Sequence, residues 1–138
     1  MNDLPPSVLI GLLVFLLICS AFFSSAETGI LSLNRYRLRH RAKEGHRGAK
    51  RVSALLSRPD RLLGTILIGN NFVNILASAI ATVLAIQLWG DAGIAIATIG
   101  LTLLLLIFGE ITPKTLAALR PEAVAYPASL PLTLLLKL

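Results

Sequence analysis

Oxygen-bearing side chains inside long apolar stretches are the residues of this sequence whose types and spacing favour ligand binding. Ser20, Ser24 and Glu27 are spaced by four and three residues, so they share one face of a helix, with Ser25 and Thr28 beside that face. A serine in a membrane helix commonly bonds back to its own backbone and needs no ligand. For a serine pair followed by a carboxylate, both back-bonding and ligand binding remain open.

A second polar group lies in the next apolar stretch, where Gly69 is followed by Asn70, Asn71 and Asn74. Asn70 and Asn74 share a helix face that continues to Ser78. Such amides commonly join membrane helices through hydrogen bonds worth about 0.6 kcal/mol each. Three of them beside a glycine instead indicate a cavity.

The third group is the segment Gly109-Glu110-Ile111-Thr112-Pro113-Lys114. Pro113 has no N–H to donate, and its ring crowds the carbonyl of Gly109, so we expect that carbonyl to be free and the helix to be bent or broken. A free carbonyl would then lie beside the Glu110 carboxylate. The alternative is a simple kink at a helix end, with Lys114 reaching the membrane interface by snorkelling.

Hydroxyls, amides, a carbonyl and one or two carboxylates form a ligand set made only of oxygen. Oxygen ligands suit hard cations such as Mg²⁺, Ca²⁺ and Na⁺ rather than zinc or copper. Ionisable groups at membrane depth are costly and usually line a cavity or pathway. Glu27 is either a second carboxylate of this set or a partner for Arg35, and both interpretations stay open.

The composition predicts the fold class. The chain has 138 residues, 55% of them hydrophobic and 14% charged, with a mean hydropathy of +0.78. An average soluble domain has roughly 25% charged residues, so a disordered chain and an ordinary soluble domain are both excluded. One cysteine and two histidines exclude a disulfide framework and a Cys/His zinc site. We therefore expect an all-α membrane protein.

Three apolar stretches predict transmembrane helices over residues of about 5–33, 62–89 and 93–113, because roughly 20 apolar residues cross a bilayer. The short turn at residues 90–93 makes the second and third helices antiparallel. We expect a single transmembrane domain over residues 1–138.

Ten of the thirteen basic residues fall in the loop 34–61 between the first two stretches. By the positive-inside rule this loop is cytoplasmic, which places the N-terminus outside in a multi-pass protein of the inner (plasma) membrane. We expect two short helices in the loop, with anionic membrane lipids rather than nucleic acid as their partner. The tail 120–138 contains Pro127 and Pro131 and predicts a juxtamembrane helix on the cytoplasmic side, with a truncated further span as the alternative.

Four motifs together resemble the transmembrane domain of the CorC/CNNM magnesium transporters: residues 20–28, Asn34-Arg35-Tyr36-Arg37, Gly69-Asn70-Asn71 with Asn74, and residues 109–114. The resemblance implies a three-span domain that forms a homodimer and binds dehydrated Mg²⁺ in an inward-facing cavity, with Mg²⁺ export coupled to Na⁺ entry. It also implies the metal-lining positions Ser24, Ser25, Gly69, Asn70, Gly109 and Glu110. Further residues expected to line the cavity or a Na⁺ site are Ser20, Glu27, Asn71, Asn74, Ser78, Pro113 and Lys114. Family members usually continue into cytoplasmic CBS modules and a C-terminal domain, and we expect both to lie outside this sequence.

The alternatives to an ion carrier are a structural membrane module, a channel and an enzyme. The first is a non-transporting membrane module for dimerisation and anchoring of cytoplasmic regulatory domains, in which the polar residues only join helices. A channel also fits the same residues. An enzyme is not expected, because the spans contain neither an HExxH pair nor a nucleophile accompanied by a histidine.

Overall fold

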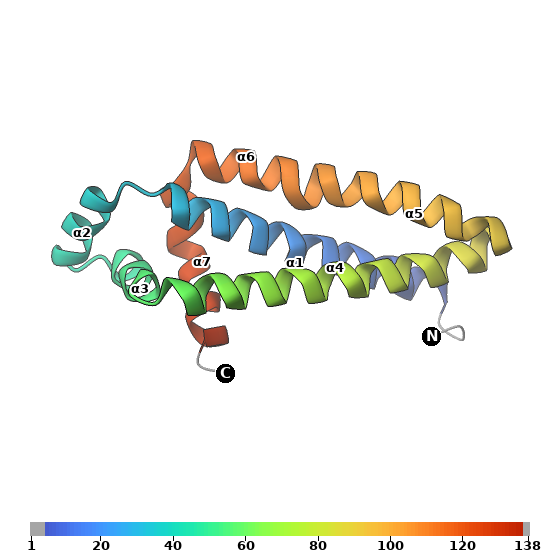
Figure 1. Ribbon diagram of the computed structural model, residues 1–138, viewed down its shortest axis with the longest axis horizontal. Coiled ribbons are helices and arrows are strands. Elements are labelled where there is room, and N and C mark those ends of the chain that lie inside the picture. Colours follow the sequence, from blue (N-terminus) through green and yellow to red (C-terminus); the bar gives the residue numbers. More distant parts are fainter. Residues whose placement is uncertain (1–4, 137–138) are drawn as a thin grey trace.

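The computed structural model describes residues 5–136, and the elements in this range are helical, as the composition predicted. Two helical stretches are long and apolar enough to cross a membrane, Pro6–Ser32 and Pro59–Leu119. The first is helix α1, and the second contains α4 (Pro59–Trp89), η1 (Gly90–Ala92), α5 (Gly93–Leu104), η2 (Leu105–Ile111) and α6 (Thr112–Leu119). The second stretch reverses at η1, so that α5 and α6 return along α4 and α1 (Figure 1).

Two glycines make this reversal possible. Gly90 ends α4 with a φ of 68°, a conformation that glycine adopts without steric cost. At Gly93, an added Cβ would lie 2.3 Å from the carbonyl oxygen of Ala85, so only glycine allows the two helices to approach this closely. The turn therefore brings the first residue of α5 against the last turns of α4.

The helix at Pro113 is not broken, contrary to one of the two outcomes expected from the sequence. The chain passes from α5 through the π-helical segment η2 into α6, and Pro113 lies in the first turn of α6. A proline crowds the carbonyl four residues earlier, and a π-helical turn is a known way to absorb such a local mismatch. The helical stretch accordingly continues past the predicted end at residue 113, to Leu119.

Three shorter helices gather at one end of the long ones (Figure 1): α2 (Arg35–Lys43), α3 (Arg47–Leu56) and α7 (Pro121–Leu136). The Asn34 side chain caps α2 by accepting hydrogen bonds from the backbone N–H groups of Tyr36 and Arg37. His46 caps α3 by accepting one from Ala49. A polar side chain thus caps the first turn of each helix in the basic loop.

Helix α7 runs across the ends of the long helices and remains one helix through Pro127 and Pro131 (Figure 1). It is fixed to the basic loop: Glu122 pairs with Arg37 and Arg41 at 3.3 and 3.6 Å, and Arg51 Nε donates to Ser129 Oγ at 3.0 Å. The last two residues of the predicted tail, Lys137 and Leu138, lie outside the described residues.

Tyr126 of α7 packs against the start of α3. An added Cβ on Gly48 would lie 2.8 Å from Tyr126 Cβ, and the Tyr126 and His46 rings lie 4.8 Å apart between centroids. Burial raises the pKa of Tyr126 above its usual 10.0, with a smaller contribution from the nearby Glu122 carboxylate. The tail and the basic loop therefore share one packed core.

The outer faces of the long helices are strongly apolar and exposed. Phe15 of α1, Ile68 and Phe72 of α4 and Phe108 of η2 are between 56% and 72% exposed. Contiguous apolar surface of this kind is unfavourable in water and is suited to a lipid environment. It fits the membrane assignment made from the composition.

Candidate functional site

Ser20 lies at the point where α1 meets α4. Its side chain is fully buried, and its hydroxyl donates to Asn74 Oδ1 at 2.9 Å and lies 3.4 Å from Asn70 Oδ1. The two asparagines are one helical turn apart on α4, as their spacing predicted. The structure thus brings together three of the polar residues chosen from the sequence.

The returning stretch reaches the same point through Gly109 of η2. An added Cβ on Gly109 would lie 3.0 Å from Ser20 Oγ, which is tighter than an ordinary van der Waals contact. Glycine therefore allows the η2 backbone to come against the serine hydroxyl. Because π-helical turns are rare and recur at functional sites, this local geometry singles out the Gly109 segment.

Ser24 lies one turn beyond Ser20 on the same face of α1 and is 1% exposed. Its hydroxyl has no hydrogen-bond partner among the described residues. A buried polar group without a partner costs about 1–3 kcal/mol, so the Ser24 hydroxyl is a candidate ligand for a cation or a water molecule.

Ser25 has a different environment from Ser24. Its hydroxyl donates to the Phe22 carbonyl at 3.1 Å, so the back-bonding interpretation holds for this residue. It lines a largely apolar groove with Thr112 and Pro113 of α6. Among the described residues, the Ser24 hydroxyl is therefore unpartnered, whereas the Ser25 hydroxyl is bonded to its own helix.

Ser20, Asn70 and Asn74 form a cluster, called the Ser20 cluster below. Phe23 of α1 packs beside it against α4, and sequence reasoning missed this residue. An added Cβ on Gly69 would lie 2.7 Å from Phe23 Cζ, so Gly69 accommodates an aromatic ring at this helix contact. The glycine was the visible signal of a close approach, but its partner on α1 could not be identified from spacing along one helix.

In the part of the chain that the structure describes, neither Glu27 nor Glu110 forms a hydrogen bond with Ser20. Glu110 Oε2 is 3.9 Å from Lys114 Nζ, and the two side chains are 37% and 46% exposed. Glu27 is partly buried and forms no ion pair with Arg35 within the described part of the chain. Asn71 and Ser78 are exposed on α4 and do not join the Ser20 cluster.

The arrangement offers neutral oxygens from two helices, a close backbone from a third and one carboxylate nearby. Hydroxyl and amide oxygens are ligands for hard cations. Within residues 5–136 no group of three or more histidine, cysteine, aspartate or glutamate side chains is placed to hold a metal ion. A cation here would be bound mainly by uncharged oxygens.

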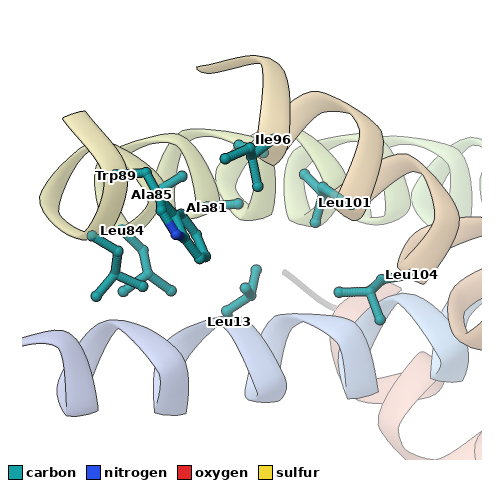
Figure 2. Close-up of a pocket in the computed structure, with 11 residues that line it drawn as sticks. Leu13, Ala81, Leu84, Ala85, Trp89, Ile96, Leu101 and Leu104 are labelled. Atoms are coloured by element: carbon teal, nitrogen blue, oxygen red, sulfur yellow. The ribbon is translucent and has the colours of Figure 1, made fainter. Parts of the chain in front are cut away.

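Nearer the α4–α5 turn, α1, α4 and α5 line an open apolar cavity of about 180 Å³. Figure 2 shows Leu13 of α1 facing this space, with Ala81, Leu84, Ala85 and Trp89 of α4 and Ile96, Leu101 and Leu104 of α5 around it. Its lining is almost wholly hydrocarbon. The polar cluster therefore lies between an apolar end and the end that carries the basic helices.

Comparison with known proteins places this arrangement in a family. The family model described as the cyclin M transmembrane N-terminal domain (CNNM) matches residues 11–138. The chain is 63% identical over 110 residues to the UPF0053 inner membrane protein YfjD of Escherichia coli, an alignment that covers 80% of this chain and 26% of that protein. It is 54% identical over 138 residues to a UPF0053 protein of Haemophilus influenzae, covering 100% of this chain and 33% of the relative.

A more distant relative is a chloroplastic DUF21 domain-containing protein of Arabidopsis thaliana, 44% identical over 115 residues, which cover 83% of this chain and 17% of that protein. The chain thus spans a third or less of the length of these curated relatives. The resemblance inferred from the four sequence motifs is confirmed. The chain belongs to the CNNM transmembrane domain family, a family of membrane proteins.

Proposed function

We propose that this domain carries Mg²⁺ out of the cytoplasm in exchange for Na⁺, through a site formed where α1, α4 and η2 meet. The observation that carries the proposal is the cluster of oxygens at the buried Ser20 and Ser24 and the half-buried Asn70 and Asn74, with the Gly109 backbone against Ser20. Polar groups gathered inside apolar helices are expensive unless they pair with one another or serve a ligand, and the Ser24 hydroxyl has no partner among the described residues. Their chemistry fits a hard cation.

The proposed topology has three spans: α1, α4 and the α5–α6 stretch. α1 and α4 have 27 and 31 residues, and each exceeds the roughly 20 residues that cross a bilayer. The arginine-rich α2 and α3 would lie in the cytoplasm by the positive-inside rule, with the N-terminus outside. The name of the Escherichia coli relative supports an inner-membrane location.

The apolar cavity favours a site that opens toward the cytoplasm. Its hydrocarbon lining near the α4–α5 turn provides no oxygen to replace the water around Mg²⁺, an ion that loses water reluctantly. The polar cluster lies on the other side of this barrier, toward the basic helices. A hydrated ion would therefore enter from the cytoplasmic end.

Binding would change the hydrogen bonds seen in the cluster. The Ser20 hydroxyl now donates to an asparagine oxygen, and a cation would compete for that oxygen and for the hydroxyl lone pairs. The Glu110 carboxylate would have to turn partly from Lys114 toward the ion to balance the charge of Mg²⁺. Na⁺, entering from outside, would compete for some of the same oxygens and help to release Mg²⁺.

The test is the thermal stability of the detergent-purified chain titrated with Mg²⁺, Ca²⁺ and Na⁺. A ligand that binds only the folded state adds about 2.7 kcal/mol of stability at one hundred times its Kd. We expect a rise with Mg²⁺ that Na⁺ opposes and that Asn70→Ala and Glu110→Gln abolish. Asn71→Ala is the matched control, because Asn71 is the neighbouring amide but is exposed. A folded protein without a Mg²⁺ response, or with an equal response in the Asn70 and Asn71 variants, would contradict the proposal.

The hydrogen bond from Ser20 to Asn74 also supports a second function. Ser20 and Asn74 satisfy each other across two helices, which is what a non-transporting module for homodimerisation and anchoring of cytoplasmic regulatory domains would require. This alternative predicts that Asn74→Ala lowers stability while no cation raises it. Transport of Mg²⁺ by reconstituted vesicles separates the two functions directly.

A further inference from the structure

We propose that a groove between α2 and α3 binds the phosphate of an anionic phospholipid headgroup. The groove has a volume of about 170 Å³ and is lined by Arg35, Leu38, Arg39, Ser53, Leu56 and Ser57. The inference rests on the three-span topology proposed above and is independent of the Mg²⁺ site.

The arginines of α2 divide between two faces of the helix. Arg37 and Arg41 face α7, where both pair with the Glu122 carboxylate. Arg35 and Arg39, also one turn apart, line the groove and form no ion pair within residues 5–136. Two guanidinium groups without a carboxylate partner among the described residues thus line one groove.

The opposite wall adds hydroxyl groups. Ser53, in the last turns of α3, and Ser57, which directly follows α3, line this wall. The Ser57 hydroxyl already donates its proton to the Ala54 carbonyl, so the Ser53 hydroxyl is the donor that this wall offers. Two guanidinium forks with a neighbouring hydroxyl are a donor set that suits phosphate oxygens. The floor of the groove is apolar, since Leu38 is 3% exposed and Leu56 packs against the core.

The position of the groove favours a lipid over a soluble phosphate. Helices α2 and α3 lie where α1 ends and α4 begins, which is the level of the headgroups if the long helices cross the bilayer (Figure 1). The cytoplasmic leaflet is negatively charged and attracts basic segments beside transmembrane helices. A phosphodiester with an apolar neighbour matches a groove that has a basic rim and a leucine floor.

The test uses the purified chain in a neutral detergent, with a chelator and at fixed ionic strength, so that the Mg²⁺ site is silent. Phosphatidylglycerol, phosphatidylcholine and inorganic phosphate are titrated separately while the melting temperature is followed. We expect phosphatidylglycerol to raise it and the other two ligands to have little effect. The Arg35→Gln/Arg39→Gln variant should weaken the phosphatidylglycerol response roughly tenfold or more.

The matched control is Arg47→Gln/Lys50→Gln, which removes the same charge from exposed positions of α3 outside the groove. It should keep most of the phosphatidylglycerol response. Arg39→Lys retains the charge without the guanidinium fork and should give an intermediate affinity even if the double variant folds poorly. Equal losses in the groove and control variants, or equal responses to the two lipids, would overturn the site. Saturation by inorganic phosphate would show a free-anion site and overturn the lipid assignment.

Discussion

The Ser20 hydroxyl donates a 2.9 Å hydrogen bond to Asn74 Oδ1 and thereby joins α1 to α4 across 54 residues of sequence. A serine hydroxyl carries one proton, so the 3.4 Å contact from the same oxygen to Asn70 Oδ1 is the weaker of the two. The Asn70 amide oxygen is therefore less engaged and more available to a ligand. In the proposed site, Asn74 would therefore have the mainly structural role and Asn70 would be the better ligand.

We expect a double-mutant cycle of Ser20→Ala and Asn74→Ala to give a coupling energy of about 0.6 kcal/mol, the typical value for a hydrogen bond between membrane helices. The same cycle with Asn70→Ala should give a smaller coupling, because the contact is longer. Denaturant unfolding in mixed micelles without added metal measures both energies. Equal couplings would show that the two asparagines share the serine proton evenly.

Gly109→Ala should destabilise the chain by about 1 kcal/mol, because the added methyl group would press on Ser20 Oγ. Gly100→Ala is the matched control on the same helical stretch, where an added Cβ has no neighbour within 4 Å. There the better helix propensity of alanine should leave stability unchanged or raised. Thermal unfolding of both variants provides the comparison. Equal effects would indicate that helix propensity, and not contact with Ser20, determines the result.

Periodicity along single helices predicted the part of the site that depends on one helix at a time. Ser20 with Ser24, and Asn70 with Asn74, share faces because a helix repeats every 3.6 residues. The difference between Ser24 and Ser25 was not predictable in this way. It depends on where α6 packs against α1, which places Ser25 in an apolar groove and leaves Ser24 buried.

The features of the fold that the sequence did not predict depend on contacts between distant segments. The pairing of Glu122 with Arg37 and Arg41 joins segments about eighty residues apart, and no local pattern selects these arginines over Arg35 and Arg39. Packing also matters at the two prolines inside α7. Pro127 and Pro131 are exposed positions within a continuous α7, where packing of the opposite face holds the helix together.

Ser129→Ala should release part of the α7 contact with the basic loop. The Ser129 hydroxyl is fully buried, accepts from Arg51 Nε at 3.0 Å and donates to the Tyr126 carbonyl. Its loss leaves a guanidinium donor without this partner, at a cost of about 1–2 kcal/mol. Unfolding measurements check the stability, and Ser57→Ala, an exposed serine on α3, is the control that should change it little. An equally stable Ser129 variant would show that the α7 contact rests on apolar packing alone.

Tyr126→Phe should remove part of the alkaline sensitivity of folding. Burial raises the pKa of Tyr126 in the folded chain above its usual 10.0, so the unfolded chain loses the phenol proton first as the pH rises. The contribution of Tyr126 to the free energy of unfolding is therefore constant below pH 10. Above pH 10 the free energy of unfolding falls, because the unfolded chain ionises more readily. The phenol oxygen has no hydrogen-bond partner among the described residues, so phenylalanine should cost little at neutral pH. Melting temperatures between pH 8 and 11 check this, and parallel curves for the two proteins would contradict it.

Lys114→Gln should strengthen Mg²⁺ binding if the proposed site includes Glu110. The Lys114 ammonium lies 3.9 Å from Glu110 Oε2, one helical turn away, and competes with a cation for the carboxylate. Both side chains are more than one third exposed, so the pair is screened by solvent and contributes at most about 1 kcal/mol. Its removal should lower the Mg²⁺ Kd by no more than about fivefold, measured by titration of the melting temperature at fixed ionic strength. Lys50→Gln changes the net charge equally on the exposed face of α3 and should leave the Kd unchanged. A Kd unaffected by Lys114→Gln, in a protein that still responds to Mg²⁺, would remove Glu110 from the ligand set and leave the Ser20 cluster to bind the ion through neutral oxygens.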